Sequence, residues 1–136
     1  MPSLFNVKAV ALAALLLTGA VHAQTYGKPQ VVVPPSNFKG VHGLAVDNQG
    51  RLLAGSVVGM SITQVDQQSG KGSILVDAPQ GQADDIAIGP KGEMAWTSFL
   101  QGVLRIRDND GAPIRVIAKD LPGINSLAFD FKTGKL

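Results

Sequence analysis

The feature that most constrains the fold of this chain is a pattern that occurs three times. Each copy contains a short apolar run, a turn with glycine and the beginning of a second apolar run, which is the pattern of a β-hairpin. Ala45, Ala87 and Ala128 occupy the same place in the three copies and are 42 and 41 positions apart (87 − 45 and 128 − 87). A period near 40 residues built from short strands is typical of the blades of a β-propeller, so the sequence predicts an all-β fold of this class.

Each complete repeat has room for four strands. The first repeat, residues 42–83, predicts strands at 44–47, 52–58, 60–65 and 73–76, and the second, residues 84–124, predicts strands at 86–89, 93–99, 103–107 and 114–118. The third repeat, residues 125–136, is incomplete. We therefore expect residues 24–136 to form a partial propeller of about two and a half blades, because repeat proteins bury their sheets against neighbouring repeats.

The two ends of the repeat region carry further expectations. Residues 31–33 are β-branched and stand before two prolines, which predicts the outer strand of a blade completed by the far end of the ring. The third repeat stops where the earlier copies open their second strand. Two explanations stay open, namely a truncated reading frame and a ring assembled from several copies of a short chain.

The first 23 residues are typical of a secretory signal peptide. A short segment ending at Lys8 precedes an apolar run at 9–20, and Val21, His22 and Ala23 form a small-residue cleavage site. The apolar run is short for a transmembrane helix, although a retained anchor is the alternative. We expect a mature chain that begins at Gln24, is exported to the periplasm or the medium, and has no membrane association after the signal is removed.

Charge and cysteine content exclude several classes of partner and site. Without Lys8 the chain has 11 basic residues (12 − 1) against 10 acidic ones, so there is no electrostatic reason to expect nucleic acid or an anionic membrane as partner. The chain has no cysteine, and His42 is the only histidine after Ala23. Cysteine nucleophiles and zinc sites built on histidine pairs are therefore excluded, and a small-molecule partner remains open.

One polar residue precedes the first strand of every repeat. His42, Asp84 and Asn125 occupy this place, and because the first strands of propeller blades surround the central channel, we predict that their side chains meet at the channel mouth. The alternative is that Asp84 and Asn125 accept hydrogen bonds from nearby backbone amides. Asp85 points to the opposite face of its strand, so we assign the channel-facing position to Asp84, which aligns with Asn125.

Residues 122–130, with the sequence Pro-Gly-Ile-Asn-Ser-Leu-Ala-Phe-Asp, resemble the senescence-marker-protein/gluconolactonase/LRE-like family of calcium-dependent six-bladed propellers. The motif of that family is close to Pro-Asn-Gly-Leu-Ala followed by a turn with Asp-Gly. The resemblance implies that Asn125 and Asp84 bind a divalent metal, calcium, and that Asp84 is the catalytic base. His42 stands where the family has a glutamate ligand, and we expect it to contact the substrate or, alternatively, to be a weak metal ligand. The implied reaction is hydrolysis of a sugar-type lactone or a related ester.

The sequence also permits a function without catalysis. An exported propeller similar to the NHL type would use the same channel end to bind a small ligand or a protein. A further channel-facing Asp or Glu beyond Leu136 would favour the enzyme. We expect residues 24–136 alone to be inactive, because about half of the family's ring and its ligands would be missing.

Overall fold

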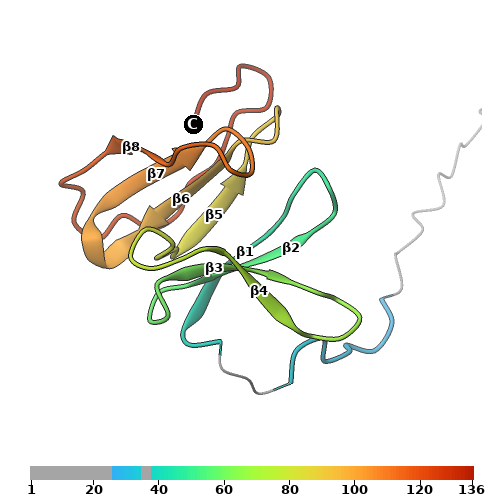
Figure 1. Ribbon diagram of the computed structural model, residues 1–136. Helices are drawn as coiled ribbons and strands as arrows, with labels where there is room; N and C mark the ends of the chain where they lie inside the picture. The colour runs from blue at the N-terminus through green and yellow to red at the C-terminus, as the bar shows by residue number, and fades with distance from the viewer. Residues whose placement is uncertain (1–25, 35–37) are drawn as a thin grey trace, which may run out of the picture.

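A computed structural model describes residues 26–34 and 38–136, and these residues form two antiparallel sheets of four strands each. The first sheet contains β1 (Val41–Val46), β2 (Leu52–Ser56), β3 (Ser61–Val65) and β4 (Gly72–Val76). The second sheet contains β5 (Asp85–Ile88), β6 (Met94–Ser98), β7 (Val103–Arg107) and β8 (Arg115–Ala118), with the short 3₁₀-helix η1 (Phe99–Gln101) after β6. Each strand pairs with the next one along the chain, which is the topology of a propeller blade (Figure 1).

The turn between β1 and β2 shows how the sequence reverses the chain. Oδ1 of Asp47 accepts hydrogen bonds from the backbone N–H groups of Gln49 and Arg51, both at 2.9 Å. Gly50 has a φ of 76°, a left-handed conformation that glycine adopts without steric cost. The local residue types therefore fix the position of this turn before any packing between strands is considered.

The apolar core lies between the two sheets. Its fully or almost fully buried members are Leu53, Ile62 and Val76 of the first sheet, Ile86, Met94 and Trp96 of the second, and Ala83 between them. Trp96 has no exposed surface. It is the largest of the fully buried side chains among the described residues, and a buried tryptophan removes a large apolar area from water.

β1 and β5 lie side by side where the two sheets meet. Each of them is an edge strand of its own sheet, and β4 and β8 form the opposite edges. A methyl group on Gly43 would lie 3.0 Å from the Cα atom of Asp85, so the backbones of β1 and β5 approach as closely as glycine permits. This is the arrangement predicted for the first strands of blades around a channel.

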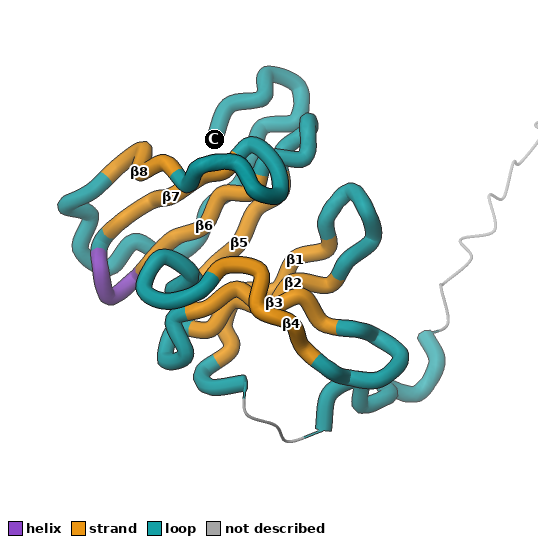
Figure 2. The backbone as a smooth tube through the Cα atoms, in the orientation of Figure 1, coloured by secondary structure: helices purple, strands orange, loops and turns teal. Residues whose placement is uncertain are grey.

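Both ends of the repeat region differ from the predicted strands. Residues 31–33 form no strand, because they have no strand partner within the described residues and a β-ladder needs one. Residues 125–129 are loop, as Figure 2 shows for the chain after β8, and the third repeat forms one isolated bridge, between Asp130 and Lys135. Strand ends also differ: β1 begins at Val41, and β2 ends at Ser56 because the chain turns directly after it.

The predicted signal peptide, residues 1–23, lies outside the described residues. Within residues 26–34 and 38–136, no helix has the length and apolar character that a membrane crossing requires. Export therefore stays a prediction from the sequence.

Candidate functional site

Two of the three predicted site residues, His42 and Asp84, lie in contact across the inner strands. Nδ1 of His42, on β1, is 3.1 Å from Oδ1 of Asp84, which directly precedes β5. The side chain of Asp84 is 5% exposed, whereas the side chain of His42 is 59% exposed. The pair therefore combines a buried carboxylate with an imidazole that a ligand can reach.

An irregularity in β1 places His42. The pairing of β1 with β2 shifts its register between Val41 and Leu44, so His42 and Gly43 lie in the irregular part of the strand. Such bulges redirect a side chain from the regular alternation of a strand. At the same point, the absence of a side chain on Gly43 lets β1 approach the beginning of β5.

The loop before β5 carries Asp84, and side chains and backbone of β6 hold it. The hydrogen bonds run from Nε1 of Trp96 to the carbonyl of Gln80 (2.8 Å), from Oγ of Ser98 to the carbonyl of Gln82 (2.6 Å) and from the amide of Asp84 to the carbonyl of Thr97 (2.8 Å). Arg105 donates a hydrogen bond to Oγ of Ser98 at 2.6 Å, which restrains the position of that hydroxyl. These hydrogen bonds fix the backbone of the loop that carries Asp84 relative to β6.

Asp85 has a different role from Asp84, as the alternation of strand residues predicts. Its Oδ1 accepts a hydrogen bond from the amide of Ile86 at 2.9 Å, and its Oδ2 accepts one from the amide of Leu127 at 3.2 Å. Asp85 therefore connects the third repeat to β5. The role of Asp84 in the site stays a prediction.

Asn125 lies in the loop that follows β8, and its side chain is exposed. Within the described part of the chain no hydrogen bond joins Asn125 to His42 or Asp84, so only two of the three predicted site residues are brought into contact. The roles of Asn125 and Asp84 as metal ligands therefore stay predictions.

The described residues do not by themselves fit a calcium site. Calcium takes six to eight oxygen ligands, and Oδ1 of Asp84 already faces Nδ1 of His42. Among residues 26–34 and 38–136, no group of three or more His, Cys, Asp or Glu side chains lies close enough to hold a metal ion. The carboxylate of Asp84 and the amide of Asn125 are suitable donors, but they supply only part of a coordination shell.

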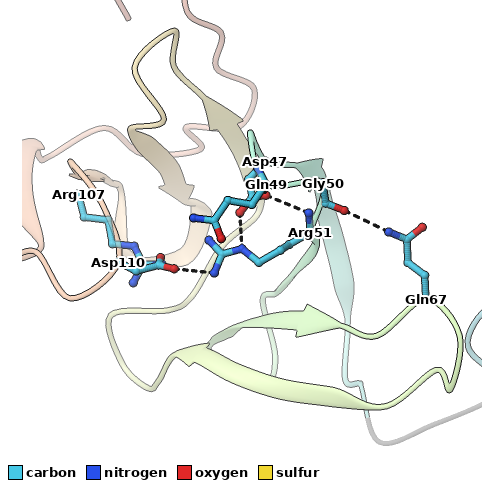
Figure 3. A network of polar contacts seen from close by, with 7 residues as sticks. All are labelled: Asp47, Gln49, Gly50, Arg51, Gln67, Arg107 and Asp110. Atoms are coloured by element: carbon cyan, nitrogen blue, oxygen red, sulfur yellow. Dashed lines mark hydrogen bonds and ion pairs between the residues drawn. The ribbon is translucent and has the colours of Figure 1, made fainter.

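A second polar cluster joins the two sheets at the other end of β1, and the sequence analysis missed it. Figure 3 shows Arg51 donating to Oδ2 of Asp47 at 2.6 Å and to Oδ2 of Asp110 at 2.5 Å. Arg107 donates to Oδ1 of Asp110 at 2.7 Å. Asp47 and Arg51 belong to the β1–β2 turn, whereas Arg107 and Asp110 belong to the end of β7 and the loop after it. We call these four residues the interblade clasp.

The electrostatics of the interblade clasp indicate a structural role. The hydrogen bond from Arg51 is the main reason that the pKa of Asp110 is lowered, and burial lowers the pKa of Arg107. Two arginines and two aspartates neutralise one another, so little charge remains for a ligand. The only sequence signal was the presence of charged residues in the turns, and nothing in the sequence showed which of them pair between blades.

Comparisons with known proteins support the fold. No protein-family model matches the sequence, and no curated protein matches it. Among solved structures, one from a nidogen/laminin complex has a TM-score of 0.59 at 20% identity, and the match covers 71% of this chain and 38% of that one. A streptogramin B lyase gives a TM-score of 0.58 at 20% identity, over 74% of this chain and 34% of the lyase. Virginiamycin B lyase from Staphylococcus aureus gives 0.51 at 16% identity, over 65% and 30%.

These structures are propeller-like, so the predicted all-β, β-propeller fold class is confirmed. Sequence identities of this size show the fold alone. The chain spans about a third of the length of each of these structures. The resemblance to the gluconolactonase family is supported only in its propeller fold, and no family model matches. Membership of that family therefore stays a prediction.

Proposed function

We propose that this chain is part of an exported β-propeller enzyme that hydrolyses lactones or related esters at the channel end where His42 and Asp84 meet. The observation that carries the proposal is the contact of 3.1 Å between a buried carboxylate and an exposed imidazole on the inner strands of two neighbouring blades. Ester hydrolysis needs a group that accepts a proton from water and returns it to the leaving oxygen. An imidazole at the mouth of a channel is suited to that exchange.

The charge of the chain supports a small neutral substrate. The mature sequence has nearly equal numbers of basic and acidic residues, and the candidate site offers one carboxylate and one imidazole rather than a cluster of cations. Polyanionic substrates would find no complementary charge there. A lactone is neutral, and its ring oxygen and carbonyl oxygen both accept hydrogen bonds.

The proposed reaction consumes one water molecule. The oxygen of water bonds to the carbonyl carbon, the bond between that carbon and the ring oxygen breaks, and the ring oxygen takes a proton, which gives a hydroxy acid. A divalent metal, if one binds as the family resemblance implies, would polarise the carbonyl. The metal stays a prediction, and the proton transfers proposed for His42 do not depend on it.

The experiment is a product analysis in ¹⁸O-labelled water with the full-length exported protein and a set of aldonolactones and simple cyclic esters. Hydrolysis predicts a hydroxy acid that carries one ¹⁸O in its carboxyl group. An unsaturated product without ¹⁸O would show elimination, the reaction type that the word lyase denotes in the streptogramin B lyase, and would contradict the proposal. Parallel assays with a chelator and with added calcium test whether a metal is needed.

The second candidate function is ligand binding without catalysis. It is favoured by the incomplete set of metal ligands within the described residues. If the folded protein turns over no lactone or ester but binds one of them saturably in calorimetry, the binding propeller is the better assignment.

A further inference from the structure

The sequence contains a single Asp-Gly pair, Asp110–Gly111, and no Asn-Gly pair. In such a pair the backbone nitrogen of glycine can bond to the side-chain carbon of the preceding aspartate, because glycine has no side chain that obstructs the approach. The product is a five-membered succinimide ring. When water opens this ring on its backbone side, the chain afterwards runs through the side-chain carbon, and the residue is isoaspartate. Asp110 is therefore a candidate site of modification, and it is also a member of the interblade clasp.

The backbone at this pair presents an accessible nucleophile. The amide of Ala112 donates to the carbonyl of Asn109 at 3.2 Å, so Asp110 and Gly111 are the central residues of a turn between β7 and β8. Gly111 is exposed and has a φ of 80°, and a methyl group on it would meet no atom within 4 Å. In the described part of the chain, no acceptor takes the amide hydrogen of Gly111. This nitrogen therefore has no hydrogen bond to break before it reacts.

The interblade clasp restrains the other reacting group, the carboxylate of Asp110. Its Oδ1 accepts a hydrogen bond from Arg107 of the same sheet at 2.7 Å, and its Oδ2 accepts one from Arg51 of the first sheet at 2.5 Å (Figure 3). Ring closure removes one of these two oxygens, so at least one of the hydrogen bonds has to break. Both arginines also favour the ionised carboxylate, which reacts poorly because the departing oxygen leaves as water from the protonated group.

We propose that Asp110–Gly111 is a site of aspartate isomerisation, and that Arg51 and Arg107 of the interblade clasp suppress the reaction while the two sheets are in contact. The nitrogen of Gly111 bonds to Cγ of Asp110, and the amide hydrogen leaves with the carboxyl hydroxyl group as water. Water then bonds to the backbone carbonyl carbon of Asp110, and the bond from that carbon to the nitrogen of Gly111 breaks. Water is the only other reactant. The inference goes beyond the proposed function and does not rest on it.

Isomerisation would open the interblade clasp. It lengthens the backbone by one carbon and leaves the free carboxylate attached to Cα, so the acceptor for both arginines is displaced. Arg51 keeps its ion pair with Asp47, whereas Arg107 is buried and its carboxylate partner is Asp110. A buried charge that loses its partner is strongly destabilising. The isomerised protein is therefore expected to unfold at a lower urea concentration than the unmodified protein.

The test compares isomerisation rates in neutral buffer. Isoaspartate in the full-length exported protein is measured by enzymatic methylation of its carboxylate and located by peptide mapping, and a synthetic peptide of residues 106–114 gives the rate of the unrestrained pair. Because hydrogen bonds to charged groups have to break, the wild-type protein is expected to react about 10-fold or more slowly than the peptide. Arg51→Gln, and separately Arg107→Gln, are expected to react several-fold faster than wild type.

Two variants serve as controls. Arg115→Gln removes the ion pair with Asp108 in the same loop and leaves the interblade clasp intact, so it is expected to keep the wild-type rate. Ile62→Val removes one buried methyl group from the core and shows how much a general loss of stability accelerates the reaction.

Three outcomes overturn the inference. The first is a wild-type protein that isomerises as fast as the peptide, and the second is an Arg51→Gln variant that is no faster than Arg115→Gln. The third is an acceleration in Ile62→Val as large as in Arg51→Gln, because the reaction would then follow opening of the whole fold rather than of the interblade clasp. A fast Arg51→Gln variant, with Arg115→Gln and Ile62→Val both close to wild type, supports it.

Discussion

Replacing Gly43 with alanine tests the geometry on which the candidate site depends. A methyl group at this position would lie 3.0 Å from Cα of Asp85 and 3.1 Å from the carbonyl oxygen of Asp84, both backbone atoms, whereas an ordinary contact begins at 3.4 Å. The inner strands must therefore separate by about 0.4 Å (3.4 − 3.0). If the movement follows the line between His42 and Asp84, the distance between Nδ1 of His42 and Oδ1 of Asp84 lengthens from 3.1 Å to about 3.5 Å.

Two opposing contributions set the effect of this substitution on stability. Overpacking costs about 1–3 kcal/mol, and the lower entropy of the unfolded alanine chain returns about 0.4–1 kcal/mol. The net expectation is a loss of roughly 1 kcal/mol in the free energy of unfolding, together with a larger separation of the His42 imidazole from the Asp84 carboxylate.

Urea unfolding and ¹⁵N-histidine spectra of the full-length protein measure both effects. Gly27→Ala is the control, because a methyl group there meets no atom within 4 Å. A Gly43→Ala variant that matches Gly27→Ala in stability and keeps the wild-type ¹⁵N signals of His42 would refute the argument that the close approach of β1 and β5 creates the site.

Three further predictions concern the core, the interblade clasp and export. Trp96→Ala is expected to lower the free energy of unfolding by about 3–5 kcal/mol in urea titrations, because Trp96 has no exposed surface and donates to Gln80; a smaller loss than in a matched surface variant would contradict its central place in the core. The lowered pKa of Asp110 means that its ion pair with Arg51 stabilises the fold above the unfolded pKa of 3.8 and that this contribution disappears as the pH falls through the lower folded value. Asp110→Asn is therefore expected to be less stable than wild type at pH 6 and to lose less stability between pH 5 and pH 3, and parallel acid limbs in thermal melts would contradict this. N-terminal sequencing of exported protein is expected to begin at Gln24, and a sequence that begins at Met1 would show that the segment is retained.

The repeat spacing predicted the fold, because the strands and turns of each repeat are specified by local sequence. Each strand ends at a residue whose conformation is specified nearby, such as Gly50 with its left-handed φ, and four strands per repeat follow from the distance between the fixed alanines. The described residues form no strand at 31–33, and the role of this segment in closing the ring stays a prediction. Its residues favour a strand, but a strand also needs a partner, and the described residues provide none.

The sequence indicates which positions could form the candidate site but not which of their side chains touch. The repeat alignment selected His42 and Asp84 as equivalent residues, and it separated Asp84 from Asp85 by the alternation of strand faces. It did not show that the two side chains touch, because this requires the register shift in β1 and the space at Gly43. It also assigned Asn125 to the same cluster, and the structure gives no contact that supports or contradicts that role.

β1 contacts the second sheet at two ends, the interblade clasp and the His42 end, and these ends differ in how their charges are paired. This difference supports the location of the candidate site. At the interblade clasp, Arg51 has a carboxylate partner on each side, and Asp110 receives two arginines. At the other end, Oδ1 of Asp84 lies 3.1 Å from Nδ1 of His42, and the side chain of His42 is 59% exposed. Since a fully paired cluster has no group left for a ligand, the chemistry of this pair of blades is expected at the His42 end, where one polar atom remains available.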